Sequence, residues 1–187
     1  YVPIEGLAAS DAEAFATPLG LVPVDSEAVH RICSLPQVSI LESAHGEEHS
    51  LEVQLPFLQV VLGEFKIVPL VVGDATEAQV AEVIEMLWDG PSTRIVVSSD
   101  LSHYFSDGDA RRLDEATRCA IEEGRVEDIS ELQACGRTAI CGLLRVARQA
   151  GLRARALDLR NSGDTAGPRD TVVGYGAFVI EETPPQS

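Results

Sequence analysis

Positive charge is scarce in this sequence. Fourteen Lys and Arg residues stand against thirty Asp and Glu residues, which gives a formal net charge of −16 over 187 residues. A surface with this charge repels phosphate backbones and anionic lipid head groups. We therefore expect neither nucleic acid nor a membrane surface as a partner.

Long apolar runs and an export signal are also lacking. No apolar stretch approaches the roughly 20 residues that a membrane-spanning helix needs, and no basic segment followed by an apolar core stands at the start. The four cysteines, at positions 33, 119, 135 and 141, form no C-x-x-C pair, so we expect reduced thiols rather than a disulfide framework. These absences predict a soluble, cytoplasmic protein.

The hydrophobic patterning is that of a globular α/β protein. Apolar, β-branched runs of strand length alternate with segments of helical periodicity. The predicted strands are residues 37–41, 66–72, 93–99, 153–159 and 171–180, and the predicted helices include residues 74–90, 109–124 and 136–151. Such alternation favours a largely parallel central sheet with helices on both faces. No repeat or Pro- and Gly-rich linker divides the chain, so we predict a single domain over residues 1–187.

The segment AHGEEHSLEVQLPFL, which begins at residue 44, contains the order H-x-x-E-H from His45 to His49. Inverted zinc peptidases carry this order on a helix, where both imidazoles converge on one zinc ion. Gly46 is a poor residue for such a helix, and the segment is better interpreted as a loop that enters a helix at about Glu47. We therefore disfavour a zinc peptidase and expect His45 to be a solvated loop residue.

Asp100 and His103, in RIVVSSDLSHYFSDG, follow a predicted buried strand. Open α/β sheets place their functional sites outside the carboxyl ends of their strands. A carboxylate and an imidazole three residues apart can share a proton, orient each other or bind one cation. Alternatively, Asp100 caps the next turn and His103 is simply exposed. This segment by itself does not distinguish between the two interpretations.

Cys135 lies at the predicted start of a helix, directly before Gly136 and Arg137. The positive end of the helix dipole and the nearby guanidinium favour the thiolate, which is the form that binds metals or attacks electrophiles. Cys135 is therefore the cysteine for which we predict a chemical role.

Six segments occur in a fixed order: TPLGLVPVD, EEHSLEVQLPFL, IVPLVVG, SSDLSHY, ACGR, and NSGDTAG with the following VVGYGAF. In this order they resemble the Memo family, in particular its prokaryotic branch, the AmmeMemoRadiSam system protein B, over nearly the whole chain. Within the second segment the resemblance involves Glu48, His49 and Glu52 but not His45. It implies a fold similar to the catalytic subunit of class III extradiol dioxygenases (LigB-like), with a pocket at one sheet edge.

The resemblance also implies a metal site. Dioxygenases of this type hold non-haem iron through two His and a carboxylate. The resemblance to Memo proteins implies instead a site with two His and one Cys, associated with iron or copper redox chemistry. The family's cysteine ligand matches Cys135. Its two His ligands lie in PHAGY-like and GPSH-like segments that precede the stretch similar to YVPIEGLA, and this sequence contains neither. We therefore expect that the family's N-terminal segment is missing and that these 187 residues alone take up little metal.

Three functions fit these residues. The first is a metal-dependent redox or dioxygenase-type enzyme that uses iron or copper, in which Cys135 binds the metal and His49, Asp100 and His103 act as catalytic groups. The second is a non-catalytic module that binds a peptide or protein in the same pocket. The third, hydrolysis by Cys135 with His103 as base, is disfavoured because no oxyanion hole or orienting residue is identified.

The implied partners follow from the first two functions and from the resemblance. We expect a small molecule or a peptide in the pocket. The resemblance also implies association with AMMECR1-type and radical-SAM proteins, and formation of a homo-oligomer is a further option. A separate alternative is that His49, Asp100, His103 and Cys135 converge closely enough to bind an ion by themselves. The substrate is not identified by any of these residues.

Overall fold

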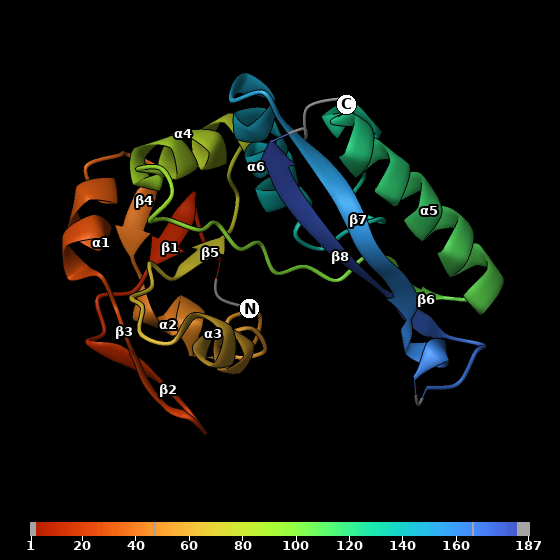
Figure 1. The fold of residues 1–187 in the computed structure, drawn as a ribbon, viewed down its shortest axis with the longest axis horizontal. Helices are drawn as coiled ribbons and strands as arrows, with labels where there is room; N and C mark the ends of the chain where they lie inside the picture. Colours follow the sequence, from red (N-terminus) through yellow and green to blue (C-terminus); the bar gives the residue numbers. More distant parts are fainter. Residues whose placement is uncertain (1–2, 47, 166, 183–187) are drawn as a thin grey trace. The chain divides into compact units, whose positions relative to one another are not determined.

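The computed structural model describes residues 3–46, 48–165 and 167–182, and the chain divides into two compact units (Figure 1). Unit 1 comprises residues 1–98 and unit 2 comprises residues 99–187. Both units combine helices with β-strands, which confirms the mixed α/β class. Among the described residues, no helix is long and apolar enough to cross a membrane.

The sheet of unit 1 has three strands in the order β4-β1-β5. Strand β1 (Leu7–Ala9) runs parallel to β4 (Val38–Ile40) and antiparallel to β5 (Leu70–Val72). All three residues of β1 are buried, as expected of a short central strand. Strands β2 (Ala14–Thr17) and β3 (Gly20–Pro23) form a separate antiparallel hairpin.

The described part of unit 1 also contains the helices α1 (Ser26–Ile32), α2 (Glu42–His45), α3 (Leu55–Leu62) and α4 (Glu77–Leu87). Helix α4 confirms the amphipathic pattern in the sequence. Thr76 caps its N-terminus, and the four predicted core residues are buried: Val80, Val83, Ile84 and Leu87. The helix start predicted at about Glu47 lies outside the described residues.

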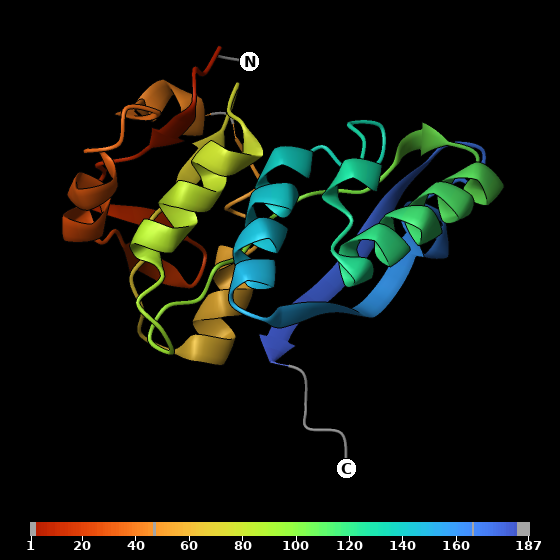
Figure 2. The same ribbon diagram turned by 90° about the horizontal axis from the view of Figure 1, so that it is seen from above.

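Unit 2 is built on an antiparallel sheet in the order β6-β8-β7. Its strands are β6 (His103–Phe105), β7 (Leu152–Asn161) and β8 (Val172–Glu182). Helices α5 (Asp107–Glu123) and α6 (Arg137–Gln149) are joined by the 3₁₀ helix η1 (Val126–Asp128), and η2 (Ser162–Asp164) lies between β7 and β8. Figure 2 shows α5 and α6 along the same side of the β7–β8 hairpin.

The core of unit 2 lies between these helices and the hairpin. Helices α5 and α6 and the segment after η1 contribute Ala120, Ile121, Ile129, Cys141 and Leu144. From the strands, Ala154, Phe178 and Ile180 pack against this cluster. The cross-strand pairs Ala154–Ile180 and Ala156–Phe178 set the register of that face.

The prediction of a largely parallel sheet is wrong for the described strands. Among the named strands the β1–β4 pair is parallel and the other pairs are antiparallel, and the isolated bridges Glu5–Asp74 and Val24–Ile67 are parallel. Strands β7 and β8 are joined by residues 162–171, whose described part contains only the short η2 and no crossover helix of the kind that parallel strands need. The expected helices on both faces are also not found among the residues of unit 2 that the structure describes, where α5 and α6 share a core on one face.

The strand predicted over residues 93–99 is likewise not formed, because no regular element is assigned to this described segment. Its β-branched composition favours a strand, but a strand also needs a neighbouring backbone to pair with. Val96 is exposed rather than buried. The strand was therefore predicted wrongly, because the prediction rested on composition alone.

Candidate functional site

Asp100 and His103 lie on a short segment of unit 2 that is bound to strand β8. The Leu101 amide donates to the Gly174 carbonyl at 2.9 Å, and the Gly174 amide donates back to the Ser102 carbonyl at 2.8 Å. Asp100 and His103 flank these two anchored residues, and Nε2 of His103 lies 3.6 Å from Oδ2 of Asp100. The exposed Asp100 and the half-buried His103 therefore face each other within reach of solvent.

Tyr104, which follows His103, has a backbone φ of 63°. This left-handed conformation is unusual for a residue with a large side chain. It coincides with an irregular register in the β6–β8 pairing between His103 and Phe105. The Tyr104 side chain is exposed, and its ring centroid lies 5.8 Å from that of His103. The strained backbone is therefore next to the Asp100–His103 pair.

Cys135 lies against the start of the same segment. Its amide donates to the Asp100 carbonyl at 3.3 Å, and its Sγ lies 3.5 Å from Oγ of Ser99 and 3.7 Å from that carbonyl. Ser99 Oγ also accepts a hydrogen bond from the Gly136 amide at 2.8 Å. Gly136 is the N-cap of α6, which confirms that Cys135 directly precedes a helix N-terminus. The thiol is exposed.

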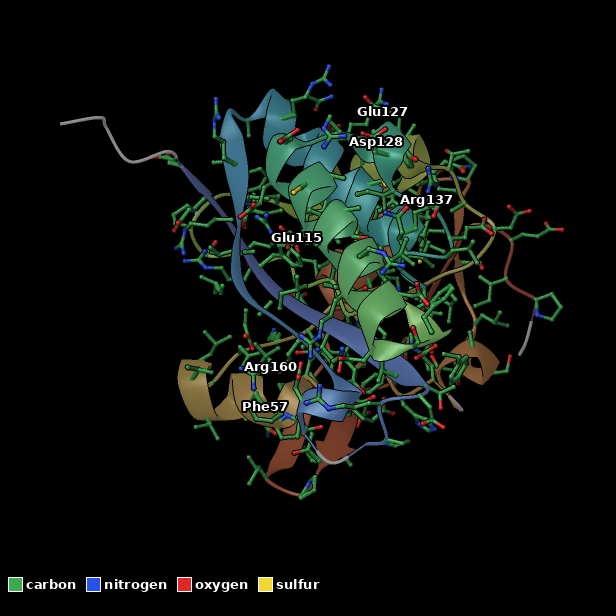
Figure 3. All side chains as sticks on the ribbon, turned by 90° about the vertical axis from the view of Figure 1, so that its right-hand side faces the viewer. Phe57, Glu115, Glu127, Asp128, Arg137 and Arg160 are labelled. Atoms are coloured by element: carbon green, nitrogen blue, oxygen red, sulfur yellow. The ribbon has the colours of Figure 1, made fainter. Side chains whose placement is uncertain are left out.

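Arg137 was expected to support the Cys135 thiolate. Its Nε donates to the carbonyl oxygen of Ile129, just beyond η1. The guanidinium is therefore engaged with the backbone at that point, and Figure 3 labels it beside the residues of η1.

Asp114 is a component of this site that the sequence analysis missed. It lies on α5 with 2% of its surface exposed, and its Oδ1 accepts the Ser102 amide at 3.0 Å. Burial raises the pKa of Asp114, while the Ser102 hydrogen bond and the charge of His103 act in the opposite direction. A signal was present, because Asp114 occupies a position between Ala110 and Thr117 on the buried stripe of α5.

A cavity of about 270 Å³ lies along α5 and the end of β7, and Asp114 contributes to its wall. Figure 3 looks onto this side of unit 2 and labels two more of its lining residues, Glu115 and Arg160. Arg160 pairs with Asp158, and Arg111, which also lines the cavity, pairs with Asp107 and Asp164. The cations of this cavity are therefore neutralised by the protein itself.

His49 belongs to unit 1, whereas Asp100, His103 and Cys135 belong to unit 2. The His49 side chain is exposed, and its carbonyl accepts the Val53 amide at 3.3 Å. Oε1 of the neighbouring Glu48 accepts the Ser50 amide at 2.8 Å. Partial burial tends to raise the pKa of Glu48, but this hydrogen bond and the nearby His49 bring it below its ordinary value.

The expectation that His45 is solvated is wrong. It is the last residue of α2, with 7% of its surface exposed, and its Nε2 lies 3.2 Å from the Ala8 carbonyl. Its ring meets that of Phe15 edge-on at 6.0 Å. Because α2 ends at His45 and His49 is not in a helix, the two imidazoles do not share the helical face that an inverted zinc peptidase requires.

The described part of the chain contains no group of three or more His, Cys, Asp or Glu side chains that could hold a metal ion. The alternative in which His49, Asp100, His103 and Cys135 bind an ion by themselves therefore finds no support. The exposed Cys135 thiol by itself fits the role of one metal ligand. Its sulfur has only the Ser99 hydroxyl and the Asp100 backbone carbonyl within hydrogen-bonding range among the described residues.

Comparison with known proteins identifies the family. The family model described as Memo-like protein matches residues 2–179. A MEMO1 family protein of Aeropyrum pernix is 40% identical over 190 residues, covering 94% of this chain and 68% of the relative. One from Archaeoglobus fulgidus is 39% identical over 182 residues, covering 90% and 68%. One from Nitrosopumilus maritimus is 36% identical over 174 residues, covering 87% of this chain and 63% of that relative.

These matches define a class of protein, and the chain belongs to it: it is a member of the Memo family. The resemblance of the six sequence segments to the Memo family is thereby confirmed. The chain spans roughly two thirds of the length of these relatives.

Proposed function

We propose that this chain forms part of a Memo-type pocket that binds iron or copper and carries out metal-dependent redox chemistry of the dioxygenase type on a small molecule. The observation that carries the proposal is the position of Cys135. Its exposed thiol, at the N-terminus of α6, contacts the segment that holds the Asp100–His103 pair. A potential metal ligand and a potential acid–base pair are thus attached to one stretch of backbone.

Cys135 suits the part of a thiolate ligand. Its contacts at 3.5 and 3.7 Å to Ser99 and Asp100 are weak, so coordination of an ion would break no strong interaction. Thiolate is a soft donor that suits Cu(I) and, with imidazoles, Fe(II). A metal of this kind supplies electron transfer and open coordination positions. The two imidazole ligands that the resemblance implies belong to segments that this sequence does not contain.

The Asp100–His103 pair is suited to moving a proton. At 3.6 Å a small side-chain rotation brings the imidazole and carboxylate into hydrogen-bonding distance, and both groups reach solvent. The hydrogen bond from the Cys135 amide to the Asp100 carbonyl fixes the backbone of this pair relative to the thiol. His49, in a Memo-type segment of unit 1, is proposed as a third catalytic group on the strength of the resemblance.

The wider setting belongs to the same proposal. Family membership and the mixed α/β composition support a class III extradiol dioxygenase-like fold for the protein as a whole. A small molecule or peptide in the pocket, a cytoplasmic location, a homo-oligomer and association with AMMECR1-type and radical-SAM proteins are the accompanying proposals.

Elemental analysis of the complete native polypeptide, purified without chelators, tests the function. We expect near-stoichiometric iron or copper in the wild-type protein and its loss in Cys135→Ser. Cys119→Ser is the matched control, because Cys119 is half-buried on α5 and should leave the metal content unchanged. Metal-free wild-type protein, or a metal content that Cys135→Ser does not alter, would contradict the proposal.

The same samples separate an enzyme from a binding module. If the wild-type protein holds no metal and captures a peptide equally well with and without the Cys135 thiol, the pocket serves binding alone. We expect the opposite result, in which loss of the metal accompanies loss of turnover.

A further inference from the structure

The segment that carries Asp100 and His103 is held from two sides. On one side, the Leu101 amide and the Ser102 carbonyl bond to Gly174 of β8 at 2.9 and 2.8 Å. On the other side, the Ser102 amide donates to Oδ1 of Asp114 on α5 at 3.0 Å. The backbone of Ser102 is thus bound between a strand and a helix, one residue away from His103.

The contact on the helix side is made by a deeply buried carboxyl group. Asp114 is 2% exposed, and the ion pairs of the nearby Arg111 go to Asp107 and Asp164 instead. Burial of a carboxylate without a cation is unfavourable, and it raises the pKa of Asp114. A neutral side chain could accept the Ser102 amide without this cost. We therefore infer that the carboxyl group of Asp114 has a second role besides accepting the Ser102 hydrogen bond.

The second role is indicated by His103. Its charge opposes the effect of burial on Asp114, so the two groups interact electrostatically. His103 also lies 3.6 Å from Asp100. The imidazole thus has the exposed Asp100 carboxyl group within 3.6 Å on its own segment, and its charge acts on the buried carboxyl group of α5.

Strand β8 is adapted to the presence of this carboxyl group. A Cβ atom added to Gly174 would lie 2.1 Å from Oδ2 and 2.6 Å from Cγ of Asp114. A side chain at position 174 would displace the carboxyl group from the Ser102 amide. Because glycine has no side chain, β8 and Asp114 of α5 can both hydrogen-bond to this segment.

We propose that Asp114 is a positioning residue for the Asp100–His103 pair, which it orients through the Ser102 amide and through its own charge. This inference rests on the proposed function, because it assigns Asp114 to the site in which that pair acts. Asp114 itself is buried, and it acts on the pair through the segment that carries it.

Two substitutions separate the hydrogen bond from the charge. Asp114→Asn keeps an oxygen that can accept the Ser102 amide but removes the carboxylate, whereas Asp114→Ala removes both. Glu123→Gln, at the exposed end of α5, is the matched isosteric control. All variants are made in the complete native polypeptide, and circular dichroism establishes that they are folded.

The measurements are hydrogen exchange of the Ser102 amide and the ¹⁵N imidazole signals of His103, which report its tautomer. We expect Asp114→Ala to speed Ser102 exchange by about 10-fold or more, since a lost hydrogen bond to a buried charged group exceeds 1.4 kcal/mol. Asp114→Asn should keep Ser102 protected yet change the balance of His103 tautomers. Glu123→Gln should alter neither.

Unchanged Ser102 exchange in Asp114→Ala, or unchanged His103 signals in Asp114→Asn, would overturn the inference. If Asp114→Ala does not fold, the Asp114→Asn spectra alone decide whether the charge acts on His103. Neither measurement depends on bound metal. Metal-free protein with the expected Asp114 effects would therefore overturn the proposed function and leave Asp114 as a positioning residue.

Discussion

The backbone amide of Cys135 donates a hydrogen bond to the carbonyl oxygen of Asp100 at 3.3 Å, across 35 positions of sequence. Through this bond the entrance of helix α6 and the segment leading into β6 form one local structure. A substitution that moves either partner is expected to disturb both the thiol and the acid–base pair.

Gly174→Ala is expected to destabilise unit 2. The new methyl group would overlap the carboxyl group of Asp114, at 2.1 Å from Oδ2, and neither β8 nor α5 can yield freely. Overpacking of this kind costs about 1–3 kcal/mol in the free energy of unfolding, which urea denaturation measures. Gly108→Ala is the control: its Cβ meets nothing within 4 Å in the first turn of α5, so a gain of about 0.5 kcal/mol is expected.

Asp114 should make stability depend on pH in a defined direction. Its pKa is raised in the folded state, so between the ordinary carboxyl range, near 4, and the raised value the folded protein binds more protons than the unfolded protein. The contribution of Asp114 to stability is therefore complete below that range and falls as pH increases through it. Urea denaturation across this pH interval should show wild-type protein losing stability relative to Asp114→Asn. A wild-type advantage that grows with pH would contradict this assignment.

Cys135 is expected to react first among the four thiols. Its side chain is exposed, Cys33 and Cys119 are half-buried, and Cys141 is fully buried. Burial also raises the pKa of Cys33, which lowers its thiolate fraction. Brief alkylation of native protein followed by peptide mass spectrometry should label Cys135 before the others and leave Cys141 unlabelled until the protein unfolds. Early labelling of Cys141 would show that the α5–α6 core is not packed as described.

Helix α3 offers a matched pair of apolar substitutions. Phe57 is 73% exposed and is labelled in Figure 3, whereas Leu55, two positions earlier, is 2% exposed. Leu55→Ala should cost about 2–5 kcal/mol of stability because it empties packed space. Phe57→Ala should change stability by no more than about 0.5 kcal/mol. Equal losses in denaturation experiments would show that Phe57 is covered in solution.

Several parts of the structure could be predicted because their signals are local. The apolar stripe of α4 and its Thr76 cap are encoded within a dozen residues, and so is the position of Cys135 directly ahead of α6. The proximity of Asp100 and His103 follows from their spacing and a turn. The order of six short segments was sufficient to identify the family, which the comparisons confirm.

The errors came from contacts between distant parts of the chain. His45 is buried because Phe15 and the Ala8 carbonyl meet its ring, and neither is near it in sequence. Residues 93–99 have the composition of a strand, but composition does not supply a pairing partner. Asp114 was missed although its place on the buried stripe of α5 was visible, because aspartate is rarely buried and its partner, the Ser102 amide, lies outside the helix.

Because Asp114 lies against Gly174, two positions sixty residues apart are coupled in evolution. A lineage that acquires any side chain at 174 must give up the carboxyl group at 114, and one that loses this group no longer needs glycine on the strand. A side chain at 174 therefore depends on a change at 114. Chains with a side chain at 174 should lack the carboxyl group at 114, and they should hold the segment before β6 by different means.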